Sequence, residues 1–381
     1  MAKVTLPPDY ETEIYRCVRC GFCTPYCPIF DAKGIESWNC RGRIIIEKAL
    51  IQGALEVTED VLDRLYTCSM CKICETNCPA KIQVVPIQEY VRKALVQQGF
   101  GPLKDHVELK ENILTHGNIA GKAPSLLEKP FSDLVIKLPD DSPNLLFSGC
   151  VGTFNYPTAI TFNTIQLLQY ANVDFTMLKA GETCCSGFLK VVGLTTEFET
   201  IGQKNIIMFE EKGIERIISP CPMCYTTFHQ EYPHISNNMP IAQHLVQVLE
   251  EVTDNASLQF ERSIDAKIAV HDGCHLGRYS NLYEPPRKIL ESIPGVELVE
   301  LPRSKEQASC CGGTIRRPYI ALRDHLSDTI INQAQEVGAD MVVTTCPTCY
   351  HNIKSAGIMR DTPVVNITTV VAYSTKLVNN L

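Results

Sequence analysis

Two groups of cysteines in the C-terminal part of the chain follow one pattern. Each group has a single cysteine, an adjacent pair and a Cys-Pro-x-Cys segment, and the groups lie about 125 residues apart. They comprise Cys150, Cys184, Cys185, Cys221 and Cys224, then Cys274, Cys310, Cys311, Cys346 and Cys349. Such a repeat indicates one supersecondary unit present twice, with its copies packed together. Five thiols exceed the four that zinc or a cubane iron–sulfur cluster takes, so neither accounts for a whole set. Taken alone, each Cys-Pro-x-Cys also fits a thioredoxin-like dithiol or half a zinc site.

A second cysteine pattern, Cys-x2-Cys-x2-Cys-x3-Cys-Pro, occurs twice near the N-terminus. In two-cluster ferredoxins with this run, the fourth cysteine binds the other cluster. We therefore predict two [4Fe–4S] clusters, one at Cys17, Cys20, Cys23 and Cys78 and one at Cys27, Cys68, Cys71 and Cys74. Zinc, or scattered buried cysteines, is the alternative. Cys40 has no counterpart in the repeat and is interpreted as a buried or half-buried thiol at a helix start, with a ligand role as the alternative.

The composition is that of a globular protein, with 45% hydrophobic and 20% charged residues among 381. No secretion signal and no apolar run long enough for a membrane helix is visible, which predicts a cytoplasmic location with any membrane attachment made through a partner. There, nineteen cysteines are expected to be ligands or redox groups rather than disulfides. The net charge of −8 argues against nucleic-acid binding. Glycine-rich nucleotide motifs are missing, so no flavin or nucleotide is predicted on this chain.

The positions of helical and apolar runs predict an α/β protein. Residues 1–100 are predicted to form a helical ferredoxin-like domain, and the Gly- and Pro-containing segment 101–143 a linker that wraps rather than packs. Residues 144–260 and 261–381 are predicted to be two repeated α/β domains with short parallel sheets. Strands are expected at 144–148, 173–178, 214–219, 267–271, 296–301 and 340–345. Ligands of such sheets lie beyond the carboxyl ends of the strands, so the ten thiols are expected to converge on one edge.

The order of these motifs resembles the CCG-domain family of iron–sulfur proteins. Over nearly the whole chain it is similar to the catalytic subunit of heterodisulfide reductase of the D type, in effect a fusion of the C and B subunits. The resemblance implies that each five-cysteine set holds a noncubane [4Fe–4S] cluster. The sequence departs from the family name at Ser186, which stands where a glycine would follow the cysteine pair. Both sets keep all five thiols, whereas the iron–sulfur subunits of related glycolate and glycerol-phosphate dehydrogenases tend to lose ligands from one.

Four other residues are candidates for contact with a substrate. His275 follows Cys274 and has a pKa suited to protonating a leaving thiolate, although a hydrogen bond to cluster sulfur or backbone is the alternative. Lys190, Arg316 and Arg317 follow the two cysteine pairs. The family's substrate carries a sulfonate and a phosphate, which arginine binds through forked hydrogen bonds. Two adjacent arginines before a proline are alternatively a solvated helix start.

These features predict an iron–sulfur thiol–disulfide oxidoreductase. The resemblance implies that it reduces the coenzyme B–coenzyme M heterodisulfide at two noncubane clusters fed by the two ferredoxin-type clusters. Splitting a disulfide takes two electrons, whereas such clusters deliver them singly, so two clusters flanking the bond suit the reaction. A partner subunit, either a membrane cytochrome b or a soluble flavoprotein complex, would donate the electrons. The alternative is a non-catalytic electron-transfer subunit of a flavin-dependent glycolate or lactate dehydrogenase, and a structural zinc protein is a further one.

Overall fold

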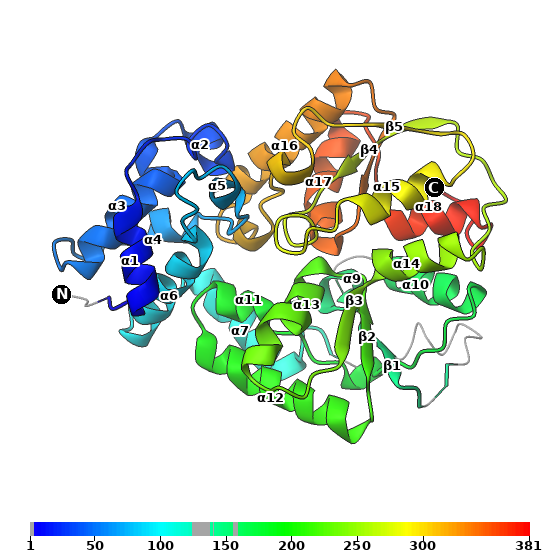
Figure 1. Cartoon of the computed structure of the whole chain (residues 1–381), viewed down its shortest axis with the longest axis horizontal. Coiled ribbons are helices and arrows are strands. Elements are labelled where there is room, and N and C mark those ends of the chain that lie inside the picture. Colours follow the sequence, from blue (N-terminus) through cyan, green and yellow to red (C-terminus); the bar gives the residue numbers. More distant parts are fainter. Residues whose placement is uncertain (1–3, 124–137, 140, 155–158) are drawn as a thin grey trace.

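The structure, a computed structural model, describes residues 4–123, 138–139, 141–154 and 159–381. Its elements form an N-terminal helical part and two α/β units (Figure 1). Both sheets are small and parallel, which confirms the predicted fold class. Within the described part, no helix is long and apolar enough to cross a membrane.

The N-terminal part consists of helices around a small apolar core. They are α1 (Pro8–Arg16), α2 (Pro28–Lys33), α3 (Cys40–Ile51), α4 (Glu59–Tyr66), α5 (Ile73–Thr76) and α6 (Val84–Gln97). Asn39 Oδ1 accepts from the Gly42 amide at 2.9 Å and so caps α3, and Thr58 caps α4 in the same way. Ile44 and Val91 are buried in the core, which fixes α3 against α6. The loops before α2 and around α5 carry the cysteine runs.

The first α/β unit contains a three-stranded sheet in the order β1-β2-β3. Its strands are β1 (Asn144–Leu146), β2 (Arg216–Ser219) and β3 (Ile241–His244). Its helices are α9 (Cys150–Phe154), α10 (Ala159–Tyr170), α11 (Gly187–Val191), α12 (Thr195–Glu211), α13 (Pro222–Thr226) and α14 (Leu245–Asp254). Leu145 pairs with Ile217, and Ile217 with Ala242. Cys150 and Cys221 therefore both follow the carboxyl ends of neighbouring parallel strands.

The second α/β unit repeats this arrangement with a fourth strand, in the order β5-β4-β6-β7. Its strands are β4 (Ala266–His271), β5 (Val296–Val299), β6 (Met341–Thr344) and β7 (Val364–Asn366). Its helices are α15 (Glu284–Glu291), α16 (Ile320–Glu336), α17 (Pro347–Met359) and α18 (Ile367–Ser374). Cys274 follows β4 and Cys346 follows β6, so this unit presents its cysteines as the first unit does.

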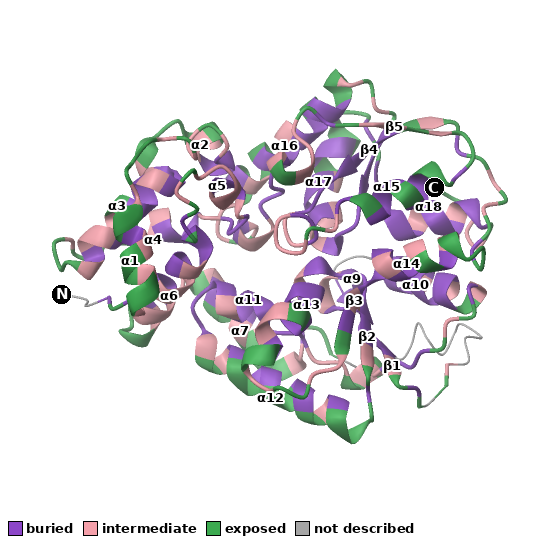
Figure 2. Ribbon diagram, in the orientation of Figure 1, coloured by how far each residue is buried: buried purple, intermediate pink, exposed green. Residues whose placement is uncertain are grey.

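The two α/β units share one hydrophobic core. Helix α10 packs on α18, and α14 packs on α15, so Leu168 and Val246 of the first unit are buried together with Leu290 and Val371 of the second. Figure 2 shows the buried residues concentrated on the strands and on the helices between the two sheets. Burial of this apolar surface holds the units in a fixed relation. The packing of the two copies agrees with the repeat.

Three details differ from the sequence prediction. The segment 101–143 is not only a wrapping linker, because it contains α7 (Lys104–His116), whose Leu109 and Ile113 are buried in the core of the first unit. The expected strand at 173–178 is reduced to a single bridge between Thr176 and Leu145. Strands β3 and β7 were not predicted, because each is short and runs directly into a helix. Residues 124–137 and 140 of the predicted linker lie outside the described residues.

Candidate metal centres

Two small cavities in the helical part bring the N-terminal cysteines together. The cysteines predicted for the first cluster line one cavity, namely Cys17, Cys20, Cys23 and Cys78. Those predicted for the second line the other, namely Cys27, Cys68, Cys71 and Cys74, and Cys74 borders the first cavity as well. Each cavity thus takes three thiols from one run and one from the other, which is the ligand pattern of a two-cluster ferredoxin. The donor set fits a pair of cubane clusters.

A buried arginine balances charge beside the second of these cavities. Arg43 is fully buried, and its guanidinium donates to the Arg64 carbonyl at 2.6 Å and to Thr67 Oγ1 at 3.1 Å. Burial raises the pKa of Cys68 to about 11, whereas the positive charges of Arg43 and Arg92 oppose that rise. Because metal ligands must be thiolates, these fixed cations favour the form that binds iron.

Cys40 lies between the two cavities and lines both. It begins α3 and is buried, as the sequence predicts. A hydrogen bond with Cys40 lowers the pKa of Cys23 to about 7, while hydrogen bonds with Cys23 and Cys74, together with burial, raise the pKa of Cys40 well above its ordinary value. The Cys40 thiol therefore keeps its proton and contacts a cysteine of each set.

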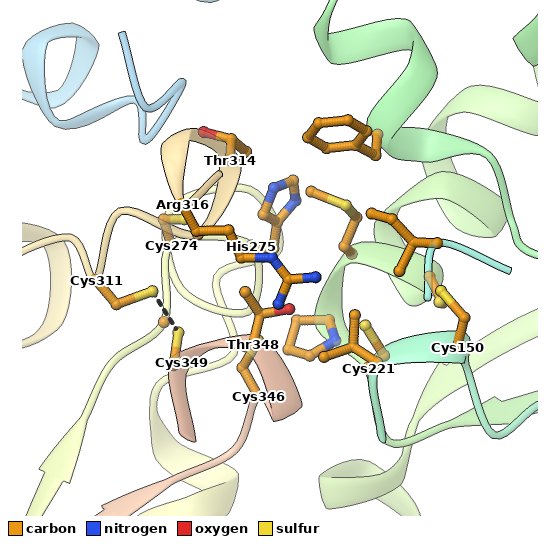
Figure 3. Close-up of a pocket in the computed structure, with 18 of the residues that line it drawn as sticks. Cys150, Cys221, Cys274, His275, Cys311, Thr314, Arg316, Cys346, Thr348 and Cys349 are labelled. Carbon is orange, nitrogen blue, oxygen red and sulfur yellow. Dashed lines mark hydrogen bonds between the residues drawn. The ribbon is translucent and has the colours of Figure 1, made fainter. Parts of the chain in front are cut away.

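All ten cysteines of the two five-cysteine sets line a single cavity where the α/β units meet. Within the first set, Cys150 Sγ lies 3.7 Å from Cys184 Sγ, and within the second, Cys311 Sγ lies 3.2 Å from Cys349 Sγ. Figure 3 shows cysteines of the two sets on opposite sides of the cavity. The ten thiols therefore converge, as expected, but each sheet contributes one set, and the two units that share a core bring both sets to one cavity.

The same backbone device orients the cysteines in each set. The amide two residues beyond the first cysteine of the pair donates to its sulfur, so Ser186 N bonds Cys184 Sγ and Gly312 N bonds Cys310 Sγ, each at 3.4 Å. Cys221 and Cys346 are the N-caps of α13 and α17, and a proline follows each. Helix N-termini and oriented amides stabilise thiolate sulfur, so both sets suit a bound iron–sulfur cluster.

The departure from glycine after the first pair has a structural explanation. Both Ser186 (φ 58°) and Gly312 (φ 71°) adopt the left-handed conformation, in which glycine meets no steric penalty. The Ser186 hydroxyl donates to the carbonyl oxygens of Cys185 at 2.7 Å and Phe198 at 3.2 Å. These hydrogen bonds offset the strain, so the first set keeps the turn without the glycine.

Arg316 and His275 lie in the cavity between the two sets. In Figure 3 the Arg316 guanidinium extends between the cysteines of the two units, and its Nη1 is buried without a hydrogen-bond partner among the described residues. The His275 ring stacks on Tyr279 with centroids 4.4 Å apart, and its Nδ1 lies 3.0 Å from Thr226 Oγ1. Burial lowers the pKa of His275 to about 4, so the imidazole is neutral at neutral pH.

The other two predicted substrate residues differ from Arg316. Arg317 borders the cavity but is more exposed and pairs with Glu108 at 2.8 Å. Lys190 does not line this cavity. Helix α11 turns its side chain toward the N-terminal part, where Nζ lies 2.8 Å from a carboxylate oxygen of both Glu89 and Glu231. The structure thus places Lys190 outside the cavity that holds the ten cysteines, and these two carboxylates balance its charge.

Two polar residues beside the cysteines escaped the sequence interpretation. Glu182 accepts from the amides of Ser148 and Gly149 at 2.9 and 2.8 Å, and so holds the turn that leads to Cys150. A ring nitrogen of His271, at the end of β4, lies within 4.8 Å of the sulfur atoms of Cys311 and Cys349. No local pattern marks either residue, because each acts on a distant part of the chain.

The second five-cysteine set is in direct contact with the N-terminal part. Cys71 packs against Cys310, with Cys274 beside them. The loop that carries Cys71 is held from the second unit, since Arg278 Nε donates to the Cys71 carbonyl at 2.5 Å and Tyr279 Oη to the Met70 carbonyl at 2.6 Å. The second N-terminal set and the second five-cysteine set are therefore joined through the Cys71–Cys310 contact.

Cysteines grouped in this way define an iron–sulfur protein of the oxidoreductase class. A family model described as cysteine-rich domain matches residues 145–229 and 268–354, and one described as 4Fe-4S dicluster domain matches residues 13–82. The chain belongs to the CCG-domain family of iron–sulfur proteins.

Relatives in this family have more than one role. The D subunit of dihydromethanophenazine:CoB–CoM heterodisulfide reductase from Methanosarcina acetivorans is 27% identical, over 95% of this chain and 94% of its own length. EtfAB:quinone oxidoreductase from Syntrophomonas wolfei is 26% identical, over 93% of this chain and 57% of its own length. The B subunit of fumarate reductase (CoM/CoB) from Methanothermobacter marburgensis is 25% identical, over 92% of this chain and 70% of its own length. Each is a redox protein, so the chain is similar to oxidoreductases that differ in substrate.

Proposed function

We propose that the chain is the catalytic subunit of a disulfide reductase acting on the coenzyme B–coenzyme M heterodisulfide. One observation carries the proposal: two complete five-thiol sets line one cavity, with the unpaired Arg316 guanidinium between them. A pure relay needs no second complete set and no binding group between the sets. The similarity to the D subunit of heterodisulfide reductase, which extends over 95% of this chain, supports the same substrate.

In this proposal each five-cysteine set holds a noncubane [4Fe–4S] cluster, and each N-terminal set holds a cubane. The overall reaction is R–S–S–R′ + 2e⁻ + 2H⁺ → RSH + R′SH. The bound clusters supply its two electrons one at a time. The chain's own residues then have to place the disulfide between the sets, exclude water and stabilise the sulfur anions that form.

Arg316 and His275 are suited to those tasks. A guanidinium with a buried, unpartnered N–H binds an anionic group of the substrate or a developing thiolate, because a charged hydrogen bond is the strong kind. The neutral His275 ring is held by Tyr279 and, through Nδ1, by Thr226, so a hydrogen bond to sulfur in the cavity would be made by its Nε2. Arg317 is already paired with Glu108, so in this proposal it contacts the substrate only at the entrance of the cavity, if at all.

Electrons are taken up at the opposite end of the molecule. Of the nineteen cysteines, all of which lie in described segments, only Cys20 is exposed. Val18 and Phe22 beside it are 75% and 63% exposed, which is unusual for apolar side chains and typical of a contact surface. We propose that an electron-donating partner, a membrane cytochrome b or a soluble flavoprotein complex, docks over this edge.

An anoxic assay tests the proposal. The purified chain is given reduced viologen and the coenzyme B–coenzyme M disulfide, and free thiols are measured. Release of two thiols per two electrons consumed is the expected result. An iron-loaded protein that oxidises reduced viologen no faster with the disulfide than without it would refute the assignment.

The second candidate is an electron-transfer subunit. Its support is the similarity to EtfAB:quinone oxidoreductase, which covers 93% of this chain, together with the exposed cysteine at one end. A relay would pass electrons from a flavoprotein to a quinone-like acceptor. It would be reduced by that flavoprotein and would show no thiol-dependent change in its iron–sulfur spectrum.

A further inference from the structure

His271 is a buried histidine with one ring nitrogen that has no hydrogen-bond partner among the described residues. It is the last residue of β4, is 1% exposed, and its Nε2 is buried without a hydrogen-bond partner among the described residues. An unpaired buried polar atom is unfavourable, because it has given up its hydrogen bonds with water. The sulfur atoms of Cys311 and Cys349, which can accept a hydrogen bond, lie within 4.8 Å of a ring nitrogen of His271.

The first unit has no such group at the equivalent place. Counting back three residues from the single cysteine gives His271 before Cys274 and Phe147 before Cys150. Phe147 is fully buried and packs edge-on against Phe228, with ring centroids 4.8 Å apart. A phenyl ring offers no N–H, so the two centres differ at this position even though their five cysteines correspond.

The difference occurs in the set whose Cys310 contacts a cysteine of the N-terminal part. Cys310 of the second set packs against Cys71, and Thr314, just beyond the second cysteine pair, donates to the Ser69 carbonyl at 2.8 Å. The second set is therefore both the set in contact with Cys71 and the set with a histidine ring nitrogen beside its sulfur atoms.

We propose that His271 donates a hydrogen bond to the thiolates of Cys311 and Cys349, and so makes the second centre easier to reduce than the first. Reduction adds negative charge that spreads onto the ligand sulfurs, and an N–H dipole aimed at them stabilises that charge. With clusters bound, this hydrogen bond would favour the second centre as the place where the first of two electrons is held. This inference rests on the proposed function only in that both sets hold clusters.

The test is an anoxic redox titration followed by electron paramagnetic resonance, on the whole chain with its clusters. His271→Phe gives the second unit the residue of the first, and His271→Gln is the matched control that keeps an N–H. The phenylalanine variant should bind as much iron as the wild type. In this variant the equilibrium constant for reduction of one centre should fall by at least about tenfold. This corresponds to a midpoint potential lower by about 59 mV for a one-electron couple. The glutamine variant should shift it less.

The centre that shifts is identified by its disappearance in Cys311→Ala. Full iron with unshifted potentials in His271→Phe would overturn the proposal, and so would a shift in the centre that survives in Cys311→Ala. Loss of the second centre's iron in both His271 variants would make the residue a ligand and would also overturn it.

A measurement on the unmutated protein covers the case in which the phenylalanine variant does not fold. With ¹⁵N-labelled histidine, pulsed electron paramagnetic resonance of the Cys311-dependent centre should show a weakly coupled nitrogen that is retained in His275→Asn. A strong coupling, or none, contradicts the proposal. Failure of the proposed function has a different signature, since it would appear in the wild type as absent clusters or absent disulfide reduction.

Discussion

The two five-cysteine sets share their ligands and differ in their surroundings. Both orient the cysteine pair with an amide two residues beyond its first member, and both place a Cys-Pro segment at a helix N-terminus. Among the described residues, only the second set has a histidine beside its thiolates in this way, and it is the second that packs on Cys71 of the N-terminal part. The two units thus share their cysteines and the backbone that orients them, while the residues around the two sets differ.

Loss of one ligand from either set is expected to have the largest effect. Cys185→Ala and Cys311→Ala should each remove about four irons and abolish disulfide reduction. They should differ in electron flow, because the contact between Cys71 and Cys310 leads only into the second set. With Cys185→Ala the remaining second centre should be reduced rapidly by the N-terminal clusters, whereas with Cys311→Ala the remaining first centre should be reduced slowly.

Rapid-freeze electron paramagnetic resonance after mixing with reduced viologen measures both rates. Equal rates in the two variants would show that the first set has its own connection to the N-terminal clusters. Survival of both the second centre's spectrum and disulfide reduction in Cys311→Ala would show that the assignment of ligands is wrong.

Replacing each of the two adjacent arginines by alanine should raise KM for the disulfide to very different extents, which differ by one to two orders of magnitude. Arg316→Ala removes a charged hydrogen-bond donor from the cavity, a loss of about 1.5–3 kcal/mol, so KM for the disulfide should rise about 10- to 150-fold. Arg317→Ala removes an exposed side chain that pairs with Glu108, and its KM should change less than about threefold. Steady-state kinetics with reduced viologen provide the values. If Arg317→Ala has the larger effect, the disulfide lies nearer the rim than we propose.

Exchanging Ser186 and Gly312, the residues that follow the two cysteine pairs, should have the smallest effects, and these are on stability. Gly312→Ser forces a side chain into the left-handed conformation, with its Cβ about 3.2 Å from Leu326 Cδ1, and should destabilise the protein by about 1–2 kcal/mol. Ser186→Gly relieves strain but removes two hydrogen bonds, so its effect should stay below about 1 kcal/mol. Thermal unfolding under anoxic conditions compares them. Equal melting temperatures would mean that the second turn accommodates a side chain as readily as the first.

The sequence predicted those features that depend on spacing within a motif. The crossed pairing of Cys27 and Cys78 follows from the ferredoxin run, and the convergence of the ten thiols follows from parallel strands that end at one edge. Helix α7 was missed because glycines and prolines on either side of it outweighed the apolar spacing of His106, Leu109 and Ile113.

The features that could not be predicted depend on contacts between distant segments. Lys190 follows the first cysteine pair closely, yet one turn of α11 is enough to point it at Glu89 instead of the cavity. The contact of Cys71 with Cys310 joins residues more than 200 positions apart, and His271 read simply as the end of a strand. Strand register and tertiary packing determine the direction of Lys190, the Cys71–Cys310 contact and the position of His271. Neither can be predicted from the local sequence pattern.

The central claim is that both five-thiol sets hold clusters that act together on one substrate. Anoxic iron determination combined with electron paramagnetic resonance, before and after addition of coenzyme M, tests it most directly. We predict about 16 irons per chain, from two cubane and two noncubane clusters, and a new paramagnetic signal when coenzyme M is added. About eight irons, or zinc in place of iron, and a spectrum unchanged by the thiol would contradict the account.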